Sequence, residues 1–166
     1  RDSGLAIGLT LSGPGQAETL YRALDVQRGG RPVFATVQAT WNILEPSTSP
    51  ALAEAHAAGM GVLVKEALAN GRLTPRNDHP DFATQRALLD ELADKYATTI
   101  DALALAAVLA QPWCTLALSG AAKTEHITSN LGALDIALSP ADLSRLLTLA
   151  EPAEQYWSTR DDLEWN

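Results

Sequence analysis

The stretch CTLALSGAAKTEHITSN, residues 114–130, joins an apolar run to a polar segment with helical spacing. The apolar run, residues 114–118, has the character of a buried strand and stops at small residues around Gly120. A helix is expected to begin after Lys123, and its first backbone N–H groups and positive dipole end then point back toward the strand. Such a junction suits an anion, for example a phosphate.

The same order of strand, turn and helix recurs along the chain, which predicts a parallel sheet with helical cover. Strands are expected at residues 5–11, 33–39, 61–65 and 114–118, and helices at 16–24, 50–58, 87–96, 98–111, 124–131 and 141–150. The helix at 98–111 is apolar nearly all round and should be sandwiched. An aromatic tail with Trp157 and Trp165 closes the chain.

The pattern alone leaves two α/β architectures open: a four-stranded doubly wound sheet, or part of a (β/α)8 barrel. A complete barrel usually needs about 250 residues, and this chain has 166. Half a barrel would fit the length. In both architectures ligands bind at the carboxyl ends of the strands, which makes Thr10, Gln38, Lys65, Glu66 and Ser119 candidates to line a pocket.

Composition narrows the classes of function. The hydrophobic fraction of 46% and the charged fraction of 19% are typical of one folded domain, and the net charge of −8 argues against nucleic-acid binding. No apolar run is long enough to cross a membrane. Cys114 is the only cysteine and is expected in the core, so we predict no disulfide and a cytoplasmic location. Because the chain starts at Arg1, its natural beginning is expected to lie upstream.

Several common motifs of catalysis and binding are missing. The chain has no GxGxxG, GxxxxGK[ST] or GxSxG pattern. His56, His79 and His126 have neither the spacing nor the cysteine neighbours of a zinc site, so no metal is expected. Of the three, His126 follows the strand–helix junction and is the one that could face an anion.

Four segments nevertheless resemble the aldo/keto reductase family. VQATWNILE at residues 37–45, GMGVLVKEALANGRL at 59–73 and LSGAAKTEHITSNL at 118–131 are similar to the sixth, seventh and eighth strand regions of that family, and AIGLT at 6–10 to the fifth. The resemblance implies a (β/α)8 barrel that uses NADP(H) to reduce carbonyl compounds. Residues 1–166 would then be a single partial domain, the carboxyl-terminal half of the barrel with strands five to eight.

The resemblance also implies a set of cofactor-binding residues. Thr10 and Gln38 would bind the nicotinamide carboxamide, and Lys65 would lie beside the nicotinamide ring. Leu68 and Gly71 would flank the pyrophosphate. The residues implied around the adenosine 2′-phosphate and the adenine are Gly120, Lys123, His126, Ser129 and Asn130.

This sequence departs from the family pattern at three positions in or next to this set of cofactor-binding residues. Lys65 stands where many members stack an aromatic residue on the nicotinamide, and Leu11 where many have Asn. Ala122 replaces the Arg that often binds the 2′-phosphate, and Lys123 is next to it. A lysine offers a point charge without the bidentate geometry of arginine, so NAD is possible beside NADP.

The family's catalytic Asp, Tyr, Lys and His all belong to the first half of the barrel. None can be assigned here, and the chain alone is expected to be inactive. Its expected partners are a small-molecule carbonyl substrate and either the missing amino-terminal half-barrel or a second copy, because half a barrel exposes two strand edges. The alternative hypothesis is a non-catalytic nucleotide-binding or regulatory module that retains the scaffold.

Overall fold

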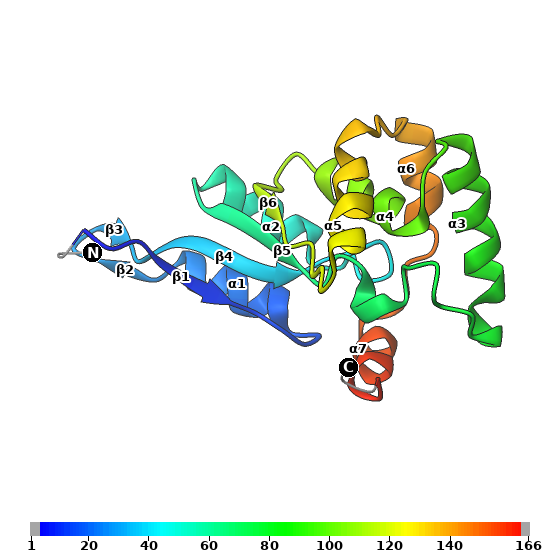
Figure 1. Ribbon diagram of the computed structural model, residues 1–166. Helices are drawn as coiled ribbons and strands as arrows, with labels where there is room; N and C mark the ends of the chain where they lie inside the picture. Colours follow the sequence, from blue (N-terminus) through cyan, green and yellow to red (C-terminus); the bar gives the residue numbers. More distant parts are fainter. Residues whose placement is uncertain (1–3, 164–166) are drawn as a thin grey trace.

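The structure, a computed structural model, describes residues 4–163. Its main sheet contains β1 (Ile7–Thr10), β4 (Phe34–Thr40), β5 (Gly61–Lys65) and β6 (Leu116–Ala117), all parallel (Figure 1). The strands lie side by side in the order in which they occur in the chain. A doubly wound sheet reverses its strand order at a switch point. This sheet has no reversal, which argues against that architecture.

The remaining elements cover or extend this sheet. A hairpin of β2 (Gln27–Arg28) and β3 (Arg31–Pro32) follows the first helix. The α-helices are α1 (Gln16–Leu24), α2 (Ser49–Ala57), α3 (Ala83–Lys95), α4 (Ile100–Leu109), α5 (Thr124–Leu131), α6 (Pro140–Leu147) and α7 (Ala153–Asp161). Short 3-10 turns occupy η1 (Ala69–Gly71), η2 (Pro80–Phe82) and η3 (Gly132–Asp135).

Most of the predicted elements are present with shifted ends. The strand predicted at 61–65 and the helices predicted at 16–24 and 124–131 have the predicted bounds. The strand predicted at 114–118 is paired only at Leu116–Ala117, so Cys114 precedes it and is half-buried against the core. Helix α7 was not predicted, and Trp165 lies outside the described residues.

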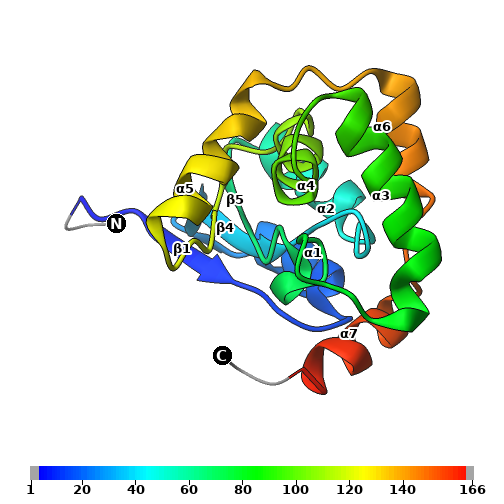
Figure 2. The same ribbon diagram turned by 45° about the vertical axis from the view of Figure 1, so that its right-hand side comes forward.

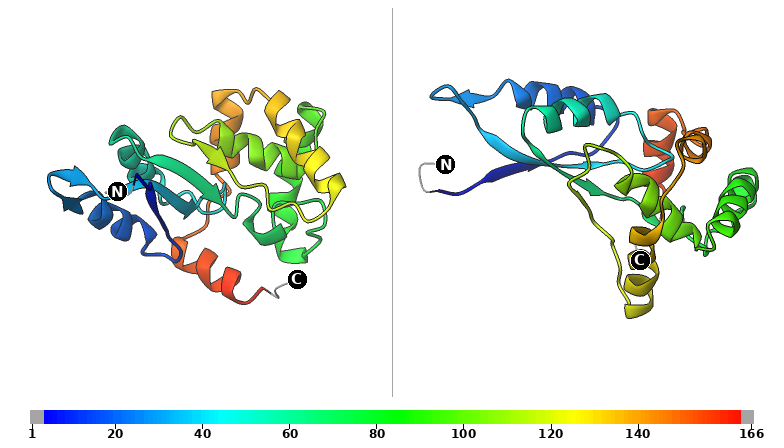
Figure 3. Two further views of the ribbon diagram at one scale, coloured as in Figure 1. Left: turned by 60° about the vertical axis from the view of Figure 1, so that its left-hand side comes forward. Right: turned by 90° about the horizontal axis from the view of Figure 1, so that it is seen from above.

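One face of the sheet carries the core. Val37, Ala39, Val62 and Val64 are fully buried there and pack in one cluster with buried side chains of α1, α2 and α4. Figure 3 shows α1 and α2 side by side over β4. The prediction for the apolar helix is confirmed: eight of the ten residues of α4 are buried, between this cluster and a second one formed with α3 and α7.

The opposite face of the sheet is open. Side chains of β4 and β5 that point away from the core, such as Gln38 and Leu63, are only half-buried, although they belong to central strands. Large apolar side chains are exposed as well, among them Leu116 (49%) in the edge strand β6, Leu131 (57%) in α5 and Leu134 (69%) in η3. Apolar surface of this kind usually marks a contact with another chain or segment.

Helices α3 and α6 form an outer pair that is joined by a polar cluster (Figure 2). Ser139 caps α6, as the sequence predicts: its hydroxyl accepts a hydrogen bond from the Asp142 backbone N–H at 3.1 Å. The nearly buried Asp142 carboxylate accepts hydrogen bonds from Lys95, Tyr96 and Ser139 at 2.6–2.7 Å. The bond from Lys95, followed by those from Ser139 and Tyr96, lowers the pKa of the Asp142 carboxyl well below its usual range.

The variant Asp142→Asn should therefore be less stable than the wild type at neutral pH, with a difference that shrinks in acid. The folded-state pKa lies below the unfolded value of about 3.9, so the ionised carboxylate stabilises the fold above that pH, and this stability is lost as the pH falls toward the folded pKa. Urea unfolding at about pH 6 and about pH 3 tests this. An equal difference at both values would contradict it.

Candidate functional site

A row of side chains crosses the open face of the sheet. Thr10 is in register with Gln38, Gln38 with Leu63, and Leu63 with Leu116. Partners in a parallel sheet lie side by side on the same face. The structure thus brings Thr10 and Gln38 together, 28 positions apart in the sequence, near the carboxyl ends of their strands.

Lys65 lies one step farther toward the carboxyl edge. It is the last residue of β5 and is in register with Thr40. Its ammonium group hydrogen-bonds to the hydroxyl of Ser12 in the loop after β1, so its side chain reaches past β4. Ser12 is exposed, and sequence reasoning did not single it out. Thr10, Gln38 and Lys65, the residues predicted to lie near a nicotinamide, therefore share one face and one edge of the sheet.

The chain after Lys65 has an unusual backbone. Glu66, Ala69 and Asn70 have positive φ angles of 54°, 47° and 53°, and Gly71 follows at 96°. Residues other than glycine rarely adopt this conformation, which costs on the order of 1–3 kcal/mol each and tends to occur at functional sites. The residues predicted at the pyrophosphate, Leu68 and Gly71, lie in this turn, residues 66–72.

The strand–helix junction around Gly120 contains the predicted elements, with β6 before it and α5 beginning at Thr124 after Lys123. Gly120 follows β6 with φ 63° and has open space where a side chain would project. Lys123 is exposed at the N-cap position of α5, in an extended conformation and without a side-chain cap. The N–H groups of Thr124 and Glu125 begin α5 and have no partner within the helix, whereas the N–H of His126, half-buried in the first turn, bonds to the Lys123 carbonyl at 3.1 Å.

Two of the predicted adenosine-side residues make internal bonds. The Ser129 hydroxyl donates to the Asp101 carboxylate of α4 at 2.7 Å. The buried Asn130 donates from Nδ2 to the carbonyl and hydroxyl oxygens of Ser119 at 3.2 and 3.0 Å, which ties α5 to the junction. Its Oδ1 is buried and has no hydrogen-bond partner among the described residues. Asn130 thus orders the junction and retains an acceptor.

Behind the strand ends lies a buried polar network that sequence reasoning missed. Asn42, fully buried, donates from Nδ2 to the Glu66 carbonyl and to the Tyr156 hydroxyl, both at 2.9 Å. Its Oδ1 accepts from the backbone N–H groups of Leu44 and Glu45 at 3.0 and 3.1 Å. Tyr156 is 114 positions away on α7, so no local sequence signal could reveal the contact.

Burial also changes the acid–base properties of this network. Desolvation raises the pKa of the buried Glu45 carboxyl, and a hydrogen bond from Ser47 opposes part of that shift. Desolvation likewise raises the pKa of the Tyr156 hydroxyl, which keeps it protonated. These groups bond to neighbouring side chains and backbone, so we assign them a structural role rather than acid–base catalysis.

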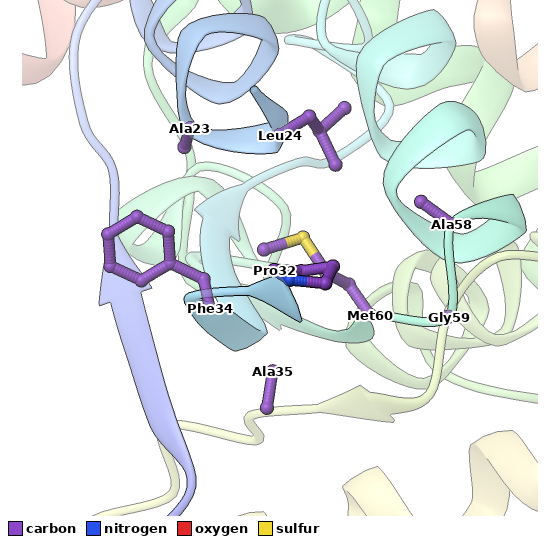
Figure 4. Close-up of a pocket in the computed structure, with 8 residues that line it drawn as sticks. All are labelled: Ala23, Leu24, Pro32, Phe34, Ala35, Ala58, Gly59 and Met60. Atoms are coloured by element: carbon purple, nitrogen blue, oxygen red, sulfur yellow. The ribbon is translucent and has the colours of Figure 1, made fainter. Parts of the chain in front are cut away.

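Other candidate sites are weaker. Among residues 4–163, no three His, Cys, Asp or Glu side chains are placed to hold a metal ion. No helix within these residues is long and apolar enough to cross a membrane. A hollow of about 210 Å³ opens at the opposite, amino-terminal end of β4 and β5, where Leu24, Phe34 and Met60 line it (Figure 4). It is remote from the carboxyl edge and carries no charged side chain.

Fold and site together define an α/β protein that is built from consecutive strand–helix units and gathers polar groups at the carboxyl edge of a parallel sheet. The chain belongs to the aldo/keto reductase family, whose sequence profile matches residues 1–151. No curated protein sequence gives a significant match.

Solved structures support the fold. The chain is similar to a thermostable aldo-keto reductase, Tm1743, in complex with the inhibitor epalrestat, with 22% identity and a TM-score of 0.65 over 87% of this chain and 48% of that one. It is also similar to a candidate 2,5-diketo-D-gluconic acid reductase B, with 24% identity and a TM-score of 0.64 over 90% of this chain and 47% of that one. The chain therefore spans about half the length of the structures that it matches.

Proposed function

We propose that this chain is the carboxyl-terminal, NADP(H)-binding half of an aldo/keto reductase barrel that reduces aldehydes or ketones. The observation that carries the proposal is the position of Thr10, Gln38 and Lys65 on one face of the sheet, at the edge where α5 presents its amino terminus. The family membership gives this arrangement its chemistry. The bound nicotinamide would supply the hydride for carbonyl reduction.

The residues present fit a dinucleotide phosphate. Gly120 leaves open space at the junction, so a phosphate can approach the backbone there. The amino terminus of α5 offers N–H groups and a positive dipole end, and Lys123 adds a positive charge. Gln38 is half-buried on the open face of the sheet, and its amide suits the nicotinamide carboxamide.

The open face of the sheet supports the half-barrel part of the proposal. Strands in chain order, with helices on one face, form an arc whose other face would become the interior of a closed barrel. Leu116 in β6, the edge strand of the sheet, is an exposed apolar side chain that a further barrel segment would cover. We infer that the covering partner is the upstream half of the barrel, with a second copy of the chain as the alternative.

A non-catalytic nucleotide-binding module is the second candidate, and Lys65 favours it. Its ammonium group reaches to Ser12 across the row where a nicotinamide ring would pack. The chain should be produced together with its upstream half, and NADPH absorbance should be followed with a panel of aldehydes and ketones. Turnover supports the reductase, whereas NADPH binding without turnover on any substrate supports the module. Absence of NADPH binding contradicts both.

The variant Lys123→Ala should weaken NADPH binding by about fivefold and leave NADH binding unchanged. The reason is that only NADPH carries the 2′-phosphate, which Lys123 is proposed to attract at the amino terminus of α5. Titration of both nucleotides by fluorescence measures the effect. Arg22→Ala, which removes an exposed cation from the last turn of α1, is the matched control. An equal loss for both nucleotides would count against 2′-phosphate recognition by Lys123.

A further inference from the structure

The turn of residues 66–72 is held at both ends by the carboxyl-terminal segment of the chain. At its start, the Glu66 carboxylate accepts a hydrogen bond from Arg160 of α7 at 3.0 Å. At its end, the Arg72 guanidinium forms a two-pronged ion pair with Glu151, the second residue before α7. The four side chains are only 11–18% exposed, so both pairs are largely shielded from solvent.

Further contacts connect α7 to the same turn. The Asn42 amide bridges the Glu66 carbonyl oxygen and the Tyr156 hydroxyl. The Arg72 guanidinium carbon lies 5.8 Å from the centre of the Tyr156 ring. The backbone N–H of Glu151 donates to the Leu44 carbonyl at 2.8 Å, which fixes the start of the segment to the loop after β4. The carboxyl-terminal segment therefore contacts the turn and its surroundings through both side-chain and backbone hydrogen bonds.

These contacts explain how the turn can keep its unfavourable backbone conformation. Its positive φ angles at Glu66, Ala69 and Asn70 are costly for side-chain-bearing residues. Strain of this kind survives only where the surroundings fix the conformation from several directions. The two ion pairs and the Asn42 bridge supply that restraint, and the family profile ends at residue 151, before α7 begins. The helical part of the restraint is thus carried by residues beyond the matched region.

We propose that residues 151–160 are a clamp that positions the turn of residues 66–72, with Arg160 and Glu151 as positioning residues for the nucleotide. The proposal rests on the proposed function for its consequence in binding, since Leu68 and Gly71 would flank the pyrophosphate. Loosening the clamp releases the turn into other conformations, and nucleotide binding must then order it again. Affinity for the nucleotide falls, while the hydride-transfer step at saturation is untouched.

The test compares Arg160→Gln with the matched variant Arg145→Gln in the full-length protein. Arg145 pairs with Glu91 on the surface, where the two side chains are 43% and 60% exposed. In Arg160→Gln, hydrogen exchange of the peptide that covers residues 66–72 should become faster, and the Kd for NADPH should rise about threefold or more, with kcat unchanged. Arg145→Gln should match the wild type in all three measurements.

Arg160→Lys keeps the charge and should restore part of the exchange protection and affinity, a rescue that loss of bulk stability would not produce. Glu151→Gln breaks the second pair and provides the same readouts if Arg160→Gln fails to fold. If hydrogen exchange in residues 66–72 is unchanged in both Arg160→Gln and Glu151→Gln, the proposed clamp is contradicted, even if the affinity for NADPH changes. If the wild type does not bind NADPH, the proposed function is contradicted. The clamp is then tested by the hydrogen exchange of residues 66–72 alone.

Discussion

Replacing Asn42 with Ala should lower the free energy of unfolding by about 3 kcal/mol. Asn42 is fully buried. In the variant the Glu45 N–H would keep its bond to the backbone carbonyl of residue 42, and the Glu66 carbonyl would keep the bond from the Ala69 N–H, but the Leu44 N–H and the Tyr156 hydroxyl would lose the partner that the Asn42 amide provides. Water cannot easily replace these hydrogen bonds in the interior, so each group would keep the cost of its desolvation. Urea unfolding followed by circular dichroism measures the effect.

The matched control for this variant is Asn77→Ala. Asn77 also uses both ends of its amide, with Nδ2 donating to the Arg72 carbonyl at 2.8 Å and Oδ1 accepting from the His79 N–H at 3.3 Å. It is only half-buried, so water can reach the groups that lose a partner, and a loss below about 1 kcal/mol is expected. Similar losses for the two variants would show that the buried network is not what stabilises this end of the sheet.

Replacing Lys65 with Met should raise the affinity for NADP+ about tenfold and that for NADPH much less. The oxidised nicotinamide ring is cationic and the reduced ring is neutral. Two positive charges roughly 10 Å apart at an effective dielectric constant of about 20 repel each other by about 1.7 kcal/mol. Removing the ammonium group of Lys65, on the same face of the sheet as Gln38, removes that repulsion for NADP+ alone, so the ratio of the two dissociation constants is the quantity to measure.

Lys65→Arg is the control, because it keeps the charge and should keep the wild-type ratio. If Lys65→Met leaves the ratio unchanged, the ammonium group does not face the nicotinamide, and the placement of the cofactor along the row of Thr10 and Gln38 is wrong. A sharp loss of both affinities would instead indicate that the Lys65 bond to Ser12 shapes the pocket.

Much of the fold could be predicted because its signals are local. The apolar run at 61–65 predicts β5 with its observed bounds, and Ser139 before Pro140 predicts the start of α6. Residues 100–109 are apolar nearly all round, which predicts that α4 is sandwiched, and eight of its ten residues are buried. Strand ends differ more from the prediction, because pairing partners rather than propensity decide where a strand stops. The strand predicted at 114–118 has only two paired residues in β6.

In the candidate site, too, local features could be predicted from the sequence and contacts between distant residues could not. The sequence by itself determined the polar residues at the ends of β1, β4 and β5, the small residues of the junction around Gly120, and the family to which these motifs belong. The tertiary structure decided that Lys65 bonds to Ser12 and that Asn42 joins Glu66 to Tyr156. It also decided that Arg160, 94 positions from Glu66, restrains the turn after β5. Strand and cap signals reside in neighbouring residues, whereas a contact between distant residues exists only after the chain has folded.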